Sequence, residues 1–228
     1  MLYQFMGMGG SPKDAVIFFL IAIFVFFISI MFHELAHGFA AYKMGDLTPK
    51  MAGRLTLNPT KHMEVSGFVC FLLLGVGWAK PMPVNPLNFK KFKTGNRIVS
   101  IAGILTNFLI GLIAAIVIGI LFACSVPMVG IAYWIYMILY YFMLVNGMLA
   151  LFNFIPLFPL DGFQFVATFL RPNNKFVEWN QKHGMQTLFG ILLISILIEM
   201  VAGIDIFSLY LNLLERFVYT PIIRIIGG

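Results

Sequence analysis

Hydrophobic residues are gathered into long uninterrupted runs along this chain. Such runs cover about residues 15–32, 98–123, 131–152 and 185–204. Each approaches or exceeds the roughly 18 to 20 residues with which a helix crosses the hydrocarbon core of a bilayer. The pattern therefore predicts an all-α polytopic membrane protein with about four to six transmembrane helices.

The region at about 45–97 has a different pattern. Its apolar run at 65–78 is shorter than a span, and the connections on either side contain helix-disfavouring residues such as Pro49, Pro81 and Pro83. We therefore expect a re-entrant segment, or short strands and loops that dip into the membrane. Irregular backbone at that depth is tolerated only where protein or a watery cavity satisfies its polar groups.

The tail at 206–228 leaves two interpretations open. Its apolar residues are interrupted by Glu215, Arg216, Pro221 and Arg224. It is either a further weak span or a helix that lies at the membrane interface.

Composition and charge agree with a multi-pass protein of a cell membrane. Of the 228 residues, 61% are hydrophobic and 11% are charged, whereas a soluble domain has about 45 to 50% apolar and about 25% charged residues. The net charge of +6 does not predict a nucleic-acid partner, because the basic residues are spread over several loops without forming one face. The expected surroundings are lipid.

The basic residues also predict an orientation. If 65–78 re-enters, all 15 Lys and Arg residues except Lys13, Arg216 and Arg224 fall on one side, which the positive-inside rule makes the cytoplasmic side. The first helix then leaves the membrane on that side. We expect a bacterial or archaeal cytoplasmic membrane.

Candidate chemistry begins at the end of the first apolar run, in His33-Glu34-Leu-Ala-His37. A helix places residues four apart on one face, so both imidazoles can bind one divalent metal while Glu34 lies beside its water. Since the helix continues to about Tyr42, the metal would lie on the order of 10 Å inside the cytoplasmic end. Polar residues are costly at that depth, so chance is a poor explanation for the motif.

A catalytic zinc site needs a third protein ligand. Asp161 is favoured by its setting, because Pro156 and Pro159 end the preceding helix and Gly162 lets backbone pass closely. A turn or capping role for Asp161 stays open on these grounds. The other candidates are Asp14, Asp46, His62, Glu64, Glu178, His183, Glu199, Asp205 and Glu215.

Two amides lie within otherwise apolar runs, Asn107 and Asn153. They have two interpretations of equal weight. They either hold helices together by hydrogen bonds, or they bind a substrate backbone or the developing oxyanion.

These motifs resemble those of the site-2 proteases, the intramembrane zinc metalloproteases. The resemblance runs from about Phe32 to Arg171 and rests on four segments in the same order. These are His33-Glu34-x-x-His37-Gly38, Arg54-Leu-Thr-Leu-Asn58-Pro59, Gly77-Trp78-Ala-Lys80-Pro81-Met-Pro83-Val-Asn85-Pro86, and Asn153 through Gly162.

The resemblance implies particular roles for these residues. His33, His37 and Asp161 would be the ligands of one Zn2+, and Glu34 would be the catalytic base. Asn107 matches the Asn of a Gly-Pro-x-x-Asn segment that the family assigns to substrate or active-site support, although Ile104 replaces the proline. We expect one transmembrane metalloprotease domain over 1–228, without a PDZ or CBS module.

The predicted function is regulated intramembrane proteolysis, in which a single-span membrane protein is cut in its transmembrane segment. Backbone in the 45–97 region would capture the unwound substrate by strand addition. The main alternative is a metal transporter or metal-dependent sensor that uses the same ligands without hydrolysis. Assembly into a homo-oligomer stays open.

Overall fold

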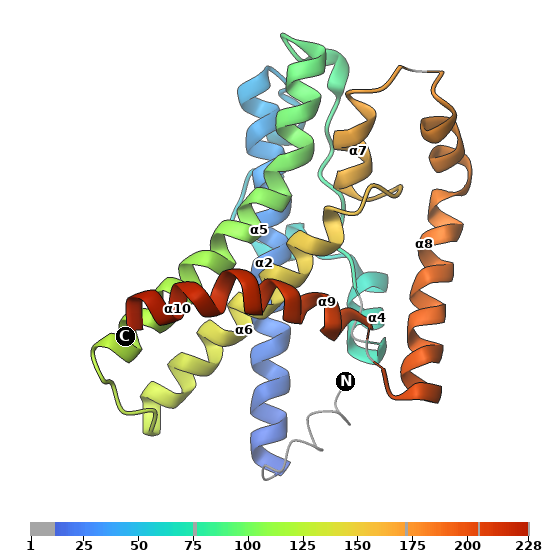
Figure 1. The fold of residues 1–228 in the computed structure, drawn as a ribbon. Coiled ribbons are helices and arrows are strands. Elements are labelled where there is room, and N and C mark those ends of the chain that lie inside the picture. The colour runs from blue at the N-terminus through green and yellow to red at the C-terminus, as the bar shows by residue number, and fades with distance from the viewer. Residues whose placement is uncertain (1–11, 75–76, 172, 205, 228) are drawn as a thin grey trace.

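The computed structural model describes residues 12–74, 77–171, 173–204 and 206–227, and within them the chain is helical with no named strand. Figure 1 shows long helices surrounded by shorter helical segments. In chain order the elements are α2 (Pro12–Met44), α3 (Thr48–Met51), η1 (Pro59–Lys61), α4 (Val65–Leu74), η2 (Pro86–Asn88), α5 (Phe92–Ala123), α6 (Gly130–Asn153), α7 (Asp161–Ala167), α8 (Lys175–Ala202), α9 (Ile206–Leu214), η3 (Glu215–Tyr219) and α10 (Thr220–Gly227).

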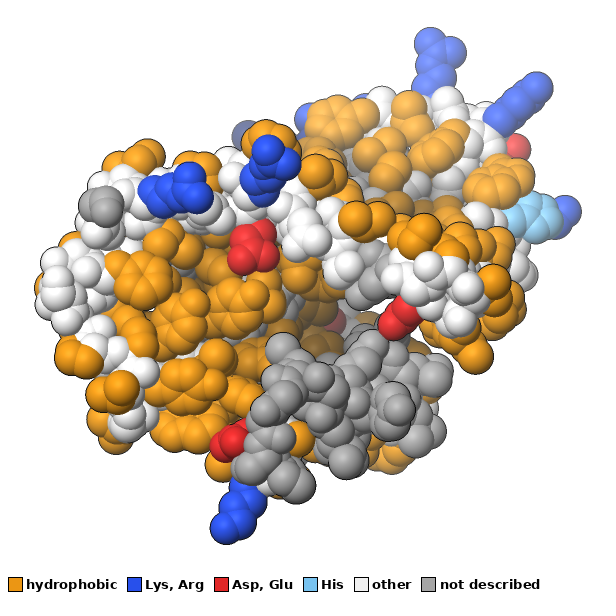
Figure 2. All heavy atoms as spheres, turned by 60° about the horizontal axis from the view of Figure 1, so that its bottom comes forward, with side chains coloured by type: hydrophobic (Ala, Val, Ile, Leu, Met, Phe, Trp, Pro, Cys, Tyr) orange, Lys and Arg blue, Asp and Glu red, His pale blue; other side chains and the backbone are white. Residues whose placement is uncertain are grey.

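Four of these helices, α2, α5, α6 and α8, are long enough and apolar enough to cross a membrane. They contain the four predicted runs, so the predicted all-α polytopic class is confirmed. Large hydrophobic side chains remain exposed on them, for example Met200 at 77% and Val201 at 87% on α8. Figure 2 shows hydrophobic side chains over broad areas of one face, as expected where lipid is the solvent.

Local signals explain where the helices end. α6 ends shortly before Pro156, which cannot continue a helix. At the start of α8 the Asn174 side chain accepts a hydrogen bond from the Phe176 N–H at 2.9 Å. At its end Gly203 adopts the left-handed conformation, with φ of 67°, that commonly terminates a helix.

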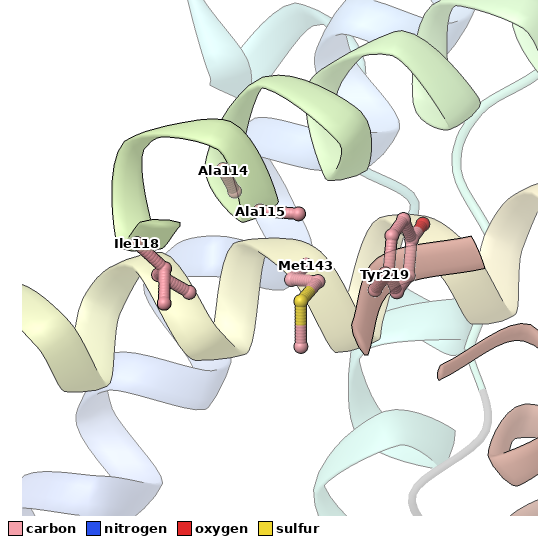
Figure 3. Close-up of a cluster of buried hydrophobic side chains, with 5 residues drawn as sticks. All are labelled: Ala114, Ala115, Ile118, Met143 and Tyr219. Atoms are coloured by element: carbon pink, nitrogen blue, oxygen red, sulfur yellow. The ribbon is translucent and has the colours of Figure 1, made fainter. Parts of the chain in front are cut away.

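Helix α5 lies at the centre of the bundle and packs against α2, α6, α7 and α10. The core where α5, α6 and the tail meet consists of small and large side chains that fit together, shown in Figure 3. Tyr219 from η3 is fully buried there, and its hydroxyl lies where a Cβ on Gly111 of α5 would be. The core residues are Ala114, Ala115, Ile118, Met143 and Tyr219.

The two ends of the 65–78 segment lie side by side, as expected of a re-entrant segment. Its ten-residue helix α4 is about 15 Å long, half the thickness of the hydrocarbon core. Met63 and Ala79, which flank the segment, form an isolated antiparallel bridge. Trp78 lies so close to Gly67 that a Cβ there would be 2.9 Å from the Trp78 backbone nitrogen.

Helix α4 reaches deep beside α2. The ring of Phe71 stacks on that of Phe26, with centroids 3.9 Å apart, and both side chains are buried. Because Phe26 is two turns before His33 on α2, the loop extends beyond the level of the HELAH motif. Apart from the Met63–Ala79 bridge, the described part of 45–91 consists of short helices and loops, and the long helix α5 begins at Phe92.

The tail consists of three consecutive helical segments, α9, η3 and α10. They run across α5 and α6 (Figure 1), and α10 packs against α5 while α9 packs against α6. None of them is among the helices long enough to cross a membrane.

The contact between Gly111 and Tyr219 generates a stability prediction. Gly111→Ala should lower the free energy of unfolding by about 1 to 3 kcal/mol, because the added methyl group overlaps the Tyr219 hydroxyl. In a Tyr219→Phe background the same change should cost less. Thermal unfolding in detergent measures both. Gly190→Ala on α8 is the matched control, since a Cβ there meets nothing within 4 Å; equal losses at positions 111 and 190 would contradict the packing argument.

Candidate metal centre

Helix α2 carries the two histidines and the glutamate of the motif on consecutive turns. His33 and His37 are buried, with 8% and 9% of their surfaces exposed, and Glu34 is half-buried. The four-residue spacing places both rings on one face of α2, as predicted. Their Nε2 atoms are 3.0 Å apart.

Asp161 reaches this face from the first residue of α7. The chain between α6 and α7 turns tightly, and Gly162 makes the turn possible because a Cβ there would overlap the Phe154 carbonyl. Helix α8 supports the turn from outside: the Asn180 side chain accepts a hydrogen bond from the Phe158 N–H at 3.1 Å. Leu188 of α8 also packs against Leu157 and Leu160. The Phe158–Pro159 peptide bond in this turn is cis.

Three potential ligand atoms form a nearly equilateral triangle. Asp161 Oδ2 lies 3.1 Å from His33 Nε2 and 3.0 Å from His37 Nε2. Two atoms bonded to one tetrahedral zinc at about 2.0 to 2.1 Å are separated by roughly 3.3 Å. The edges of the triangle are close to this value, so the donor set and its spacing fit a zinc ion.

Hydrogen bonding prepares His37 to bind a metal through Nε2. His37 Nδ1 is 2.7 Å from the Val99 carbonyl oxygen on α5, which can only accept, so Nδ1 carries the proton. In a neutral imidazole Nε2 is then left with its lone pair free. Among the described residues, His33, His37 and Asp161 are the His, Cys and acidic side chains that come together in this way.

Gly103 of α5 forms the wall behind the two imidazoles. A Cβ at this position would overlap His37 Nε2 and would lie 2.5 Å from His33 Cε1. The glycine therefore lets α5 approach α2 closely enough to enclose the triangle. Sequence reasoning placed Gly103 in a motif without assigning it this contact.

Glu34 lies next to the triangle, and its carboxylate is held by main chain from a distant segment. Glu34 Oε2 accepts a hydrogen bond of 2.6 Å from the Met82 backbone N–H. Glu34 Oε1 has no hydrogen bond to the described part of the chain. This contact was not predicted, because the sequence does not show which group a backbone N–H meets in the fold.

The other candidate ligands have different surroundings. Asp46 is fully buried and binds Thr48, Asn85 and Asn88. Burial alone would raise the pKa of Asp46, but these hydrogen bonds prevail and hold that pKa below its ordinary value. His62 Nε2 is 2.9 Å from the Thr56 carbonyl oxygen, and Asp205 lies outside the described residues.

The two predicted amides differ in their surroundings. Asn107 is completely buried on α5, one turn beyond Gly103, and neither atom of its amide has a partner in the described structure. Asn153 is half-buried and donates from Nδ2 to the Leu149 carbonyl of its own helix at 3.0 Å. A third amide, Asn146, which the sequence analysis did not single out, donates to Ser29 Oγ at 2.8 Å.

The position of Gly103 makes a prediction about metal affinity. Gly103→Ala should weaken zinc binding by about 10- to 100-fold, because the methyl group displaces both imidazoles. Zinc titration against a competing chelator measures the change. Gly190→Ala, which makes the same exchange in open space, should bind zinc like the unaltered protein. Unchanged affinity in Gly103→Ala would show that the rings are not enclosed as described.

Comparisons with known proteins place the chain among zinc metalloproteases. It is 38% identical over 154 residues to a putative zinc metalloprotease, YwhC of Bacillus subtilis, an alignment that covers 64% of this chain and 67% of YwhC. It is 27% identical over 202 residues to the zinc metalloprotease MJ0392 of Methanocaldococcus jannaschii, covering 85% of this chain and 50% of that protein. No family model and no solved structure matches.

The chain thus spans two thirds of the length of one curated relative and half of the other. The resemblance seen in the motifs agrees with both relatives. The chain belongs to the site-2-protease-like family of zinc metalloproteases.

Proposed function

We propose that this protein is an intramembrane zinc metalloendopeptidase that cleaves a transmembrane segment of a single-span membrane protein. The observation that carries the proposal is that Asp161 of α7 meets His33 and His37 beside Glu34. The two histidines and Glu34 lie on α2, which is apolar enough to span a membrane. The names of YwhC and MJ0392 support the protease class and the metal.

His33, His37 and Asp161 would hold one zinc ion through the atoms of the triangle. Zinc held by such ligands supplies Lewis acidity and makes water a stronger acid. The Val99 carbonyl fixes the tautomer of His37, and the α8-supported turn holds Asp161 in place. These contacts hold His37 and Asp161 in place, so little rearrangement of these two ligands accompanies metal binding.

Glu34 is the proposed general base. Its Oε2 is occupied by the Met82 N–H, which leaves Oε1 to take the proton from the attacking water and pass it to the leaving amine. Glu34 follows His33 directly on α2, so its side chain begins next to one of the three proposed ligands.

Asn107 is the proposed donor to substrate. Its amide is buried, lacks a partner among the described residues and lies one turn deeper than Gly103 on α5. A peptide backbone that enters the site unwound exposes N–H and C=O groups that such an amide can pair with. In this view the unpaired amide of the free enzyme is satisfied when substrate binds.

The proposed setting is a cell membrane with the site nearer its cytoplasmic side. All Lys and Arg residues except Lys13, Arg216 and Arg224 belong to the side at which α2 ends. The re-entrant 65–78 segment supports this assignment, because Met63 and Ala79 meet and the loops around them share one side.

Variants of Glu34 and Asp161 distinguish a protease from a metal transporter. Glu34→Gln should keep its zinc and lose cleavage by about 100-fold or more, since the base is removed without a ligand. Asp161→Ala should weaken zinc binding by about tenfold or more and lose cleavage as well. Purified protein is assayed for zinc content and for cleavage of single-span peptides in proteoliposomes. Glu178→Gln, an exposed acid on α8, is the control.

A transporter would behave differently in the same proteoliposomes. Zinc flux without cleavage, or flux that persists in Glu34→Gln, would contradict the protease proposal and support the alternative. Full cleavage activity in both Glu34→Gln and Asp161→Ala would refute the assigned roles.

Asn107 can be tested by separating stability from turnover. Asn107→Leu removes a buried amide without a protein partner, so thermal stability should stay equal or rise. Cleavage efficiency should nevertheless fall by about tenfold or more, because a donor to substrate is lost. Asn153→Leu, made in parallel, tests the second predicted amide; unchanged cleavage in Asn107→Leu would assign Asn107 to structure alone.

A further inference from the structure

A proline-rich segment lies across the catalytic helix; we call residues 79–86 the strap. Prolines at 81, 83 and 86 have no N–H to donate and hold φ near −65°. They also restrict the residues before them to extended conformations. Within Pro81-Met82-Pro83 the only backbone N–H belongs to Met82, so the sequence leaves one donor at this point.

That single donor is used on Glu34. The bond from the Met82 N–H to Glu34 Oε2 is 2.6 Å long and joins residues 48 positions apart. Short hydrogen bonds to a carboxylate are stronger than those between neutral groups. The bond fixes one oxygen of the carboxylate and thereby the direction in which the other points.

The strap is anchored on both sides of this contact. Before it, the Lys80 N–H donates to the His62 carbonyl at 2.8 Å, and Arg54 Nη2 donates to the Lys80 carbonyl at 2.7 Å. After it, the Asn85 N–H donates to the buried carboxylate of Asp46 at 2.7 Å. The donor therefore has a fixed position relative to α2.

Gly38 leaves room for the Met82 side chain on α2. It lies one turn after Glu34 on the same face, and a Cβ there would be 2.9 Å from the Met82 sulfur and 2.8 Å from Leu55 Cδ2. A side chain at 38 would have to displace these two side-chain ends. The glycine therefore lets the Met82 side chain pack on α2 beside the bond from its N–H to Glu34.

We infer that the Met82 backbone N–H is a positioning group for the catalytic base, and that the strap exists to present it to Glu34 Oε2 so that Oε1 faces the reacting water. This inference rests on the proposed function, because it assigns a role to Glu34 in catalysis. It concerns the orientation of the carboxylate and not metal binding, since the strap contacts none of the three proposed ligands through a hydrogen bond in the described structure.

The test removes the donor and keeps every side chain. Incorporating the α-hydroxy analogue of methionine at 82 converts the amide into an ester, which keeps the side chain and removes the N–H. We expect kcat for cleavage of a single-span peptide to fall by about 10- to 100-fold, because the base is no longer held in line. KM should stay within about twofold, since substrate binding is untouched.

Matched measurements separate positioning from structural support. The equivalent ester at Val84 removes an N–H that has no acceptor in the described part of the chain, and it should cleave like the unaltered enzyme. The Met82 ester should also retain its zinc, its thermal stability and the visible absorption bands of its cobalt-substituted form, which report the ligand geometry.

The outcomes divide cleanly. Unchanged kcat in the Met82 ester, or equal losses in both esters, would overturn the inference. Loss of zinc or altered cobalt bands in the Met82 ester would overturn it too, because the strap would then support the ligands. If the unaltered protein does not cleave, or Glu34→Gln cleaves equally well, the proposed function fails instead.

Discussion

Two imidazoles and a carboxylate that are buried among apolar helices must satisfy one another, and the rest of the structure is arranged around that requirement. A charged residue at the centre of a membrane helix costs roughly 2.5 to 3.5 kcal/mol on insertion scales. The Nε2 atoms of His33 and His37 and Oδ2 of Asp161 lie about 3 Å from one another, and this contact offsets the cost. A shared cation is the occupant that three such lone-pair donors favour together.

The requirement explains why glycine recurs wherever another element approaches the site. Gly103 lets α5 lie against the imidazoles, Gly162 lets the Asp161 turn close on the end of α6, and Gly38 lets a side chain of the strap pack on α2. In each case a Cβ would meet an atom at less than 3 Å. Close approach keeps the polar groups within bonding reach while the outer surfaces of the same helices stay apolar.

Much of this arrangement is visible in the sequence because it depends on which residue occupies each position. Span-length apolar runs, the four-residue spacing of the histidines and the prolines before Asp161 all follow from residue type. The setting of Asp161 and the resemblance single it out as the third ligand, but the contact of its carboxylate with α2 comes from the tertiary fold. The Met82 donor and the Val99 acceptor belong to the backbone, so the sequence does not show that they meet Glu34 and His37, even though the flanking prolines leave Met82 as the one N–H donor at its point.

The supports of the proposed ligand Asp161 come from α8, the least buried of the four candidate membrane spans. Helix α8 holds the Asp161 turn through Asn180 and Leu188, while its second half presents side chains such as Met200 and Val201 outward. A shift of α8 at Asn180 and Leu188 would therefore also move the turn that carries Asp161. The acyl chains around this helix, or the detergent that replaces them, therefore help to hold the site in place. Bilayer thickness becomes one of the variables that set how well the three ligands are brought together.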